Sequence, residues 1–141
     1  MHHIDLFHTI AAGAEIPDDR KLDGVDLVVY LRGEMLGAPS ETLFWREGYH
    51  QSVRHQGWKL YRTDMPDNRR WLFDLTEDPT ERTNLVHQHP ERLADLEALL
   101  DAHNAEQAEP MSPNITQSPQ LIDKHGGQPY EEGDEYIYRP N

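Results

Sequence analysis

Residues 57–85 constrain the fold of this chain more than any other stretch of its sequence. Within it, residues 58–63 and 70–75 alternate with a period of two, which is typical of half-buried β-strands. The second segment places its large apolar side chains on one face: Trp71, Phe73 and Leu75. The Met-Pro-Asp-Asn sequence at residues 65–68 favours a turn, so we expect two antiparallel strands.

Further short strands and a helix complete a predicted sheet with one covered face. Residues 42–46 and 51–55 also favour strands, which gives four strands in sequence order and predicts an antiparallel meander. The clearest helix spans residues 90–107, where Pro90 suits the first helical position and leucines recur every three or four residues. That apolar stripe should cover one face of the sheet.

The two ends of the chain differ from this central part. Residues 4–14 predict a short helix that ends near Gly13 and needs a partner surface to be stable. Residues 108–141 are rich in Pro, Ser, Gln and Gly, and we expect them to form an irregular tail. The predicted fold class is therefore α+β: a four-stranded antiparallel sheet covered by a C-terminal helix and preceded by a short helix.

Composition excludes several classes of function. The chain has 26 acidic and 13 basic residues, a formal net charge of -13, which argues against partners such as nucleic acids and anionic membranes. It contains no cysteine, so a cysteine nucleophile, disulfides and Cys-ligated zinc are excluded. No apolar run approaches the roughly 20 residues that span a bilayer, and no signal-peptide pattern opens the sequence.

One group of residues near a predicted turn suits an anionic substrate. Arg46, Tyr49 and His50 lie close in sequence, with Arg54 nearby, and arginine and histidine are suited to binding anions. We name Arg46, Tyr49 and His50 as candidate substrate-binding residues. The alternative is an exposed, polar strand end without a ligand.

Other polar clusters have simpler explanations. His87 and His89 could place two imidazoles near a metal ion, but no third ligand is indicated nearby, and a solvated approach to the helix is the alternative. Residues 123–127 (Asp-Lys-His-Gly-Gly) favour a surface turn. The acids at the end of the second alternating segment suit turn and cap roles instead of catalysis: Asp74, Asp78 and Glu81.

Several motifs in a fixed order resemble one known family. Gly-Trp-Lys-Leu begins at Gly57, Leu-Phe-Asp-Leu at Leu72, and Asp-Pro-x-Glu-x-x-Asn-Leu at Asp78. Together they resemble the C-terminal portion of the sulfatase family, which shows G-x-W-K-L, L-Y-D-L and D-P-x-E-x-x-N-L at similar spacing. The upstream sequence resembles the family too, with a D-L-F-x-T helix from Asp5, an Asp-Gly pair before residue 25, and Phe-Trp-Arg at residues 44–46.

The resemblance covers about residues 3–100 and implies a domain organisation. Residues 1–36 would be the end of an α/β catalytic domain, residues 37–107 a C-terminal sheet-plus-helix subdomain, and residues 108–141 the tail. Two departures are mild, since His8 stands where the family has proline and Phe73 where it has tyrosine. The family includes periplasmic, secreted and cytoplasmic members, so the resemblance implies no compartment.

The resemblance also implies which chemistry this chain lacks. Family enzymes use a cysteine or serine in C/S-x-P-S-R, converted to formylglycine, and a calcium-type divalent ion held by residues that precede the matched region. This chain has no cysteine and no Ser-x-Pro-Ser-Arg, so no catalytic residue, metal ligand or cofactor is assigned to it. Residues 123–126 resemble the D-H-G metal motif only superficially, because Lys124 interrupts it and it follows the sheet.

Three hypotheses for the function follow. The first is a C-terminal fragment of a sulfatase-like hydrolase, inactive alone and completed by a missing N-terminal catalytic domain. The second is a non-catalytic interaction module that pairs with a separately encoded catalytic chain or with itself. The third is a small metal-binding protein, which rests on His87 and His89 alone.

Overall fold

The structure is a computed structural model that describes residues 2–17, 22–64, 68–108, 118–121, 131–134 and 136–139. The chain forms two compact units, Met1–Glu41 and Thr42–Asn141. The break between the units follows Glu41, and the first strand of the second unit begins at Thr42.

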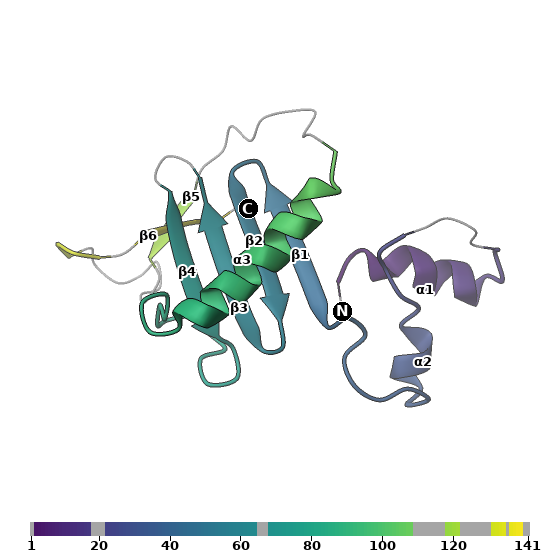
Figure 1. The fold of residues 1–141 in the computed structure, drawn as a ribbon. Coiled ribbons are helices and arrows are strands. Elements are labelled where there is room, and N and C mark those ends of the chain that lie inside the picture. The colour runs from purple at the N-terminus through teal and green to yellow at the C-terminus, as the bar shows by residue number, and fades with distance from the viewer. Residues whose placement is uncertain are drawn as a thin grey trace. The chain divides into compact units, whose positions relative to one another are not determined.

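The second unit is built on a four-stranded sheet. Its strands are β1 (Thr42–Glu47), β2 (His50–His55), β3 (Trp58–Thr63) and β4 (Arg69–Asp74). They lie in the order β1-β2-β3-β4, and each pairs antiparallel with the next along the chain (Figure 1). The predicted meander is therefore confirmed.

Glycines set the two tightest turns of the sheet. Gly48 opens the β1–β2 turn with a φ of 58°. Gln56 and Gly57, between β2 and β3, both have positive φ, at 49° and 82°, as a type I′ hairpin turn requires. A Cβ atom on Gly57 would also lie 2.8 Å from Cγ2 of Thr76, so this position has two reasons to be glycine.

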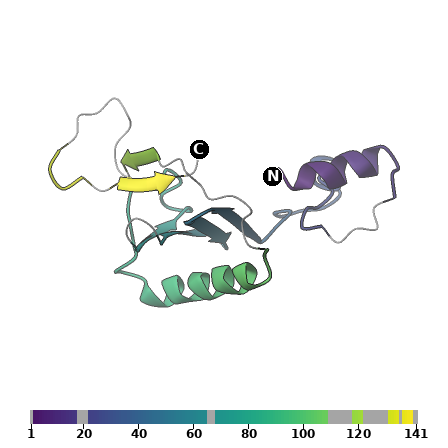
Figure 2. The same ribbon diagram turned by 90° about the horizontal axis from the view of Figure 1, so that it is seen from above.

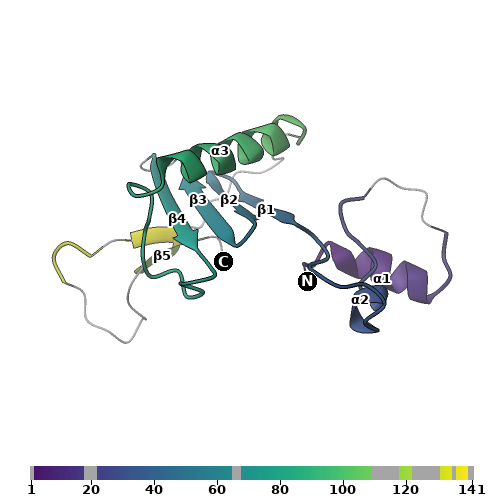
Figure 3. The same cartoon turned by 60° about the horizontal axis from the view of Figure 1, so that its bottom comes forward.

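Helix α3 (Pro90–Ala105) covers one face of the sheet, as predicted (Figures 2 and 3). One row of apolar side chains crosses the four strands beneath it: Phe44, Val53, Leu60 and Leu72. Leu96 and Leu100 of α3 join this row in the main hydrophobic core. The leucine periodicity of the helix and the alternation of the strands therefore identify the same contact surface.

A second apolar cluster lies on the opposite face of the sheet. Trp71 and Phe73 are fully buried there, and Tyr61 packs against them with its ring centroid 5.6 Å from that of Trp71. The expectation of a single covered face was thus too simple, because β4 buries apolar side chains on both of its faces. The aromatic alternation that identified the strand also produces this second cluster.

Polar contacts attach α3 to the sheet beside the apolar core. Nη1 of Arg62 lies 2.7 Å from Oδ1 of Asp101, and Nη2 of Arg62 donates to Oε1 of Gln51 at 2.6 Å. The same Gln51 oxygen accepts a hydrogen bond of 2.7 Å from Asn104 of the helix. Because hydrogen bonds are directional and apolar packing is not, these contacts specify the position of the helix along the sheet.

The first unit contains two short helices, α1 (Asp5–Gly13) and α2 (Val28–Leu31). The Asp5 side chain is 1% exposed, and its carboxylate accepts hydrogen bonds from the backbone N–H groups of His2, at 2.7 Å, and Val25, at 3.2 Å. The Thr9 hydroxyl accepts from the N–H of Leu27 at 3.1 Å. The Asp and Thr of the D-L-F-x-T motif therefore connect α1 to the segment before α2.

The segment predicted as an irregular tail contains a pair of strands. β5 (Ser118–Leu121) and β6 (Tyr136–Arg139) pair antiparallel, which corrects the expectation for this part of the chain. The Tyr-Ile-Tyr sequence of β6 has high β-propensity, a local signal that the surrounding Pro- and Gly-rich composition concealed. Residues 123–127, the predicted surface turn, lie outside the described residues. Among the residues that are described, no helix has the length and apolar character needed to span a membrane.

Candidate functional site

The acids at the end of β4 and after it stabilise turns, as their sequence context predicts. Oδ1 of Asp74 accepts hydrogen bonds from the backbone N–H and the hydroxyl of Thr76, at 2.9 Å and 2.6 Å. These bonds, the hydroxyl bond foremost, hold the pKa of Asp74 below its usual value. Neither the geometry nor this pKa suits a general acid, which must hold its proton near neutral pH.

Asp78 closes the next turn in the same way. Its Oδ2 atom accepts hydrogen bonds from the N–H groups of Arg82, at 2.6 Å, and Thr83, at 2.8 Å. Desolvation acts to raise the pKa of Asp78, but the hydrogen bonds from Thr83, Arg82 and Thr80 outweigh it and the pKa is lowered. The Asp-Pro pair of the third motif is thus a structural corner.

Glu81 has a different role from the two aspartates. Its two carboxylate oxygens lie 2.7 Å and 2.8 Å from Nζ of Lys59, and the two side chains are only 15% and 20% exposed. Its backbone is left-handed, with a φ of 58°, which is uncommon for a residue other than glycine. The ion pair connects the glutamate of the third motif to the lysine of Gly-Trp-Lys-Leu.

Asn84 attaches the end of the third motif to β4. Its Oδ1 atom accepts from the N–H groups of Leu72, at 3.0 Å, and Val86, at 3.1 Å. The N–H of Leu85 then donates to the carbonyl of Leu72 at 2.8 Å. The three motifs of the sequence analysis are therefore parts of one physical arrangement, and none of these contacts requires catalysis to explain it.

The candidate substrate-binding residues do not form one cluster. Arg46 is exposed and pairs with Gln51, on the sheet face that carries α3. His50 lies on the other face, is 3% exposed, and places Nδ1 3.0 Å from the Tyr61 hydroxyl. Tyr49 is exposed in the turn between them. The sequence prediction grouped these residues because they are close in sequence, but the register of the hairpin points Arg46 and His50 to opposite sides of the sheet.

The electrostatics of His50 also differ from the expectation of an anion-binding cation. Burial lowers the pKa of this imidazole, and the nearby Glu47 carboxylate only partly opposes the effect. The ring is therefore neutral at physiological pH and is suited to a hydrogen bond with Tyr61. Of the predicted group, Arg54 remains as a cation that faces the same side of the sheet as His50.

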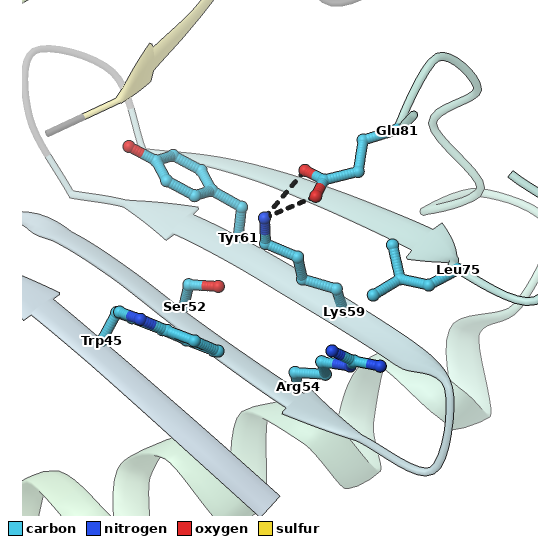
Figure 4. Close-up of a pocket in the computed structure, with 7 residues that line it drawn as sticks. All are labelled: Trp45, Ser52, Arg54, Lys59, Tyr61, Leu75 and Glu81. Atoms are coloured by element: carbon cyan, nitrogen blue, oxygen red, sulfur yellow. Dashed lines mark hydrogen bonds and ion pairs between the residues drawn. The ribbon is translucent and has the colours of Figure 1, made fainter. Parts of the chain in front are cut away.

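A pocket on the sheet face opposite α3 is the main candidate site. Its volume is about 360 Å³, and it is lined by seven described residues: Trp45, Ser52, Arg54, Lys59, Tyr61, Leu75 and Glu81 (Figure 4). Small-molecule sites usually measure about 300–1,000 Å³ and combine apolar surface with a few polar groups. The lining fits that description, since it holds two aromatic rings, one leucine and four polar or charged side chains.

Sequence reasoning named only Arg54 from this pocket. The signal that would have found the rest is the register: Trp45, Ser52 and Tyr61 are cross-strand neighbours in one row, and Arg54 and Lys59 are neighbours in the next. Reading that register from sequence requires knowing that both turns have two residues. Glu81 could not be found in this way, because it follows the sheet and reaches back to it.

The two candidate metal ligands lie near the start of α3. His87 and His89 are exposed, and the ring of His89 packs edge-on against Trp58 with a centroid distance of 5.0 Å. Within the part of the chain that the structure describes, no three His, Cys, Asp or Glu side chains gather in a way that could hold a metal ion.

Steryl-sulfatases of two rodents are similar in sequence to this chain. The steryl-sulfatase of Mus musculus is 34% identical over 72% of this chain, and that of Rattus norvegicus is 30% identical over 73%. The chain spans only 22% and 24% of the lengths of these two relatives. No protein-family model matches the chain.

Solved structures share the fold. A protein in complex with its substrate D-glucosamine-2-N,6-O-disulfate has a TM-score of 0.58 at 18% identity, with 72% of this chain and 23% of that chain covered. The phosphonate monoester hydrolase of Agrobacterium radiobacter has a TM-score of 0.53 at 21% identity and covers 96% of this chain and 28% of its own. At such identities the likeness concerns the fold.

The motifs, the α+β fold and the relatives agree with one another. The sheet, the covering helix and the short first helix are those that the resemblance predicted, and steryl-sulfatases match about 72% of the chain. The match is consistent with a C-terminal portion of a sulfatase, and it spans less than a quarter of each relative's length. The resemblance to the sulfatase family is thereby confirmed, and the chain is a sulfatase-like sequence over most of its length.

Proposed function

We propose that this chain is the C-terminal part of a sulfatase-type hydrolase, whose whole protein hydrolyses sulfate esters. Its role is to complete the fold of the catalytic domain and to form one side of the active-site cleft. The proposal is supported by the relatives, of which the chain spans 22% and 24%. It is also supported by apolar side chains that are exposed among the described residues of the first unit.

Those exposed side chains are the observation that carries the proposal. Of the ten large apolar side chains that are exposed among the described residues, eight belong to the first unit. On α1, Leu6 and Phe7 are adjacent, and Ile10 follows them by four and three residues, so the three side chains form one exposed stripe. Asp5 on the same helix is buried. A helix that exposes its apolar side and buries an acid is typical of an interface whose partner is missing.

The partner that we infer is the catalytic domain that precedes the matched region in sulfatases. Sulfate ester hydrolysis in this family needs a hydrated aldehyde nucleophile, a divalent cation to neutralise the sulfate oxygens, and a general acid for the leaving oxygen. None of the turn acids described above fits the last role, and the chain has no cysteine or Ser-x-Pro-Ser-Arg to provide the first. The chain alone is therefore expected to be inactive.

Substrate contacts in the assembled protein would come from the turn between β1 and β2. Arg46 and Tyr49 are exposed there and can reach an anionic group outside the sheet. His50, buried and bonded to Tyr61, would position the turn and would not touch the substrate. These assignments are part of the proposal and depend on it.

An activity assay tests the proposal directly. The purified chain should hydrolyse 4-nitrophenyl sulfate no faster than buffer, with or without added Ca²⁺. Mixing it with a separately expressed sulfatase catalytic domain that lacks the matched region should restore turnover and form a complex on size exclusion. Turnover by the chain alone that persists after chelation and repurification would overturn the inert-fragment proposal.

The exposed stripe also supports a second candidate, a non-catalytic module that pairs with another chain or with itself. Sedimentation distinguishes the cases: self-association should depend on concentration and disappear in a Phe7→Ser/Ile10→Ser double variant, because both side chains are exposed. A monomer at all concentrations would argue against self-pairing.

The DNA upstream of codon 1 distinguishes a single polypeptide from two separately encoded chains. A continuous reading frame encoding C/S-x-P-S-R would place the catalytic part in the same protein.

A further inference from the structure

We propose that the pocket on the sheet face opposite α3 binds a small anion attached to a planar aromatic ring, such as an aryl sulfate or an aryl carboxylate. The seven described residues that line it all belong to the second unit, and binding requires neither a nucleophile nor a metal ion. It is separate from the β1–β2 turn to which substrate contacts were assigned above. Its test therefore gives a result independent of the proposed hydrolase function.

The register of the sheet brings the relevant groups together. Trp45 of β1, Ser52 of β2 and Tyr61 of β3 are direct cross-strand neighbours. Arg54 lies two residues beyond Ser52 on β2, so its Cβ is about 7 Å further along the same face. Figure 4 shows the side chains of Trp45 and Arg54 on the same face of the sheet, with Ser52 on the same strand as Arg54 and beside Trp45. These spacings suit a ring over the indole with its anionic group near Arg54.

Charge in the pocket favours an anion. Arg54 and Lys59 are direct cross-strand partners, and like charges in that position destabilise a sheet. Lys59 is neutralised by Glu81, whose oxygens lie 2.7 Å and 2.8 Å from its Nζ atom. Within the described part of the chain no ion pair or hydrogen bond holds the Arg54 guanidinium. The lining thus keeps one positive charge, in a protein whose net charge is -13.

A buried hydroxyl points to the same conclusion. Ser52 is 5% exposed and lines the pocket, yet its Oγ atom has no hydrogen-bond partner among the described residues. A buried polar group without a partner costs free energy, so such groups in folded proteins usually have a reason to be retained. An oxygen of a bound anion would accept a hydrogen bond from this hydroxyl. The indole of Trp45, 36% exposed, offers a flat apolar surface for the ring.

The experiment is a titration of the full chain followed by NMR, with the indole N–H of Trp45 as the reporter. Three probes share one ring and differ in charge: phenyl sulfate, benzoate and uncharged benzyl alcohol. We expect saturable binding of the anions in the millimolar range and much weaker binding of the alcohol. Preference for phenyl sulfate would identify a sulfate ester as the natural class of ligand, and equal or stronger binding of benzoate a carboxylate. Equal binding of all three, or of none, would overturn the proposal.

Variants assign the effect to the pocket. Arg54→Gln should weaken anion binding about tenfold, as expected for a charge-assisted hydrogen bond, while Arg54→Lys should retain most of it. Trp45→Ala removes the indole reporter, so its binding is followed by the backbone amide signals of Ser52 and Arg54, and the variant should bind all ring probes more weakly. The matched control is Arg82→Gln, which removes an equal charge from an exposed side chain outside the pocket and should leave binding unchanged. Thermal melts check that each variant is folded; a folded Arg54→Gln variant with undiminished affinity would refute the assignment.

Discussion

The ion pair between Lys59 and Glu81 allows the sharpest quantitative prediction about this chain. Exposed ion pairs contribute about 0.2–1 kcal/mol, whereas hydrogen bonds to charged groups in less exposed settings contribute about 1.5–3 kcal/mol. With side chains 20% and 15% exposed and two contacts of 2.7 Å and 2.8 Å, this pair belongs nearer the second range. We expect Glu81→Gln to lower the free energy of unfolding by about 2 kcal/mol.

The two halves of the pair should not be equivalent. Removing Glu81 leaves the Lys59 ammonium unneutralised directly opposite Arg54, and the repulsion adds a few tenths of a kcal/mol to the loss. Removing Lys59 instead relieves that repulsion. Lys59→Met should therefore destabilise the chain less than Glu81→Gln, by about 0.5 kcal/mol.

Urea denaturation of the single and double variants provides the measurement. If the pair acts as the structure indicates, the double variant will lose less than the sum of the singles, with a coupling of about 1–2 kcal/mol. The control is Glu77→Gln, an exposed acid of the same corner, whose effect should stay within about 0.5 kcal/mol. Losses that add within about 0.3 kcal/mol would show that the two side chains are not coupled, and the reasoning would fail.

Three further predictions concern a backbone contact and two titrating groups. Gly24→Ala would place a Cβ atom 2.1 Å from the carbonyl oxygen of Ile4, so the first unit should lose amide exchange protection, and an unchanged exchange pattern would contradict the packing. The lowered pKa of Asp78 stabilises the fold above its unfolded pKa of 3.8, so stability should fall as the pH falls through the lower folded pKa. Asp78→Ala should reduce that acid sensitivity in urea melts between pH 5 and about pH 2, and an unchanged slope would argue against the capping role. Burial also lowers the pKa of His50, so below the unfolded pKa of 6.5 the unfolded chain binds the proton first and the free energy of unfolding decreases. A His50→Gln variant should show a flatter dependence of stability on pH in that range. An equally steep dependence in the variant would contradict the burial of His50.

Sequence reasoning succeeded where the signal was local. Alternation over a few residues is read directly from the chain, so the four strands lie close to the predicted bounds. Leucine spacing likewise identified α3, which ends at Ala105, two residues before the predicted end. Tyr-Ile-Tyr in β6 was missed because its neighbours are typical of disordered sequence.

The candidate site depended on information that is not local. Arg46 and His50 are four residues apart, but the register of the hairpin places them on opposite faces. Glu81 reaches Lys59 across 22 residues from a left-handed backbone position, which no periodicity predicts. The neutral state of His50 follows from burial by the folded sheet. Faces, pairs and desolvation are properties of the assembled sheet, so the pocket emerged only with the structure.

The simple strand order has a consequence for how this protein folds. Each strand of the order β1-β2-β3-β4 pairs with the strand that follows it in the chain, and α3 then packs on β2 and β3. Loops this short cost little closure entropy, and chains with mostly local contacts fold faster than those with distant pairings. The hairpins can therefore form as the chain leaves the ribosome, but the apolar row from Phe44 to Leu72 stays open until the leucines of α3 have been synthesised. The helix is thus the step that commits the sheet to its final form, and truncation before Leu96 should yield hairpins without a core.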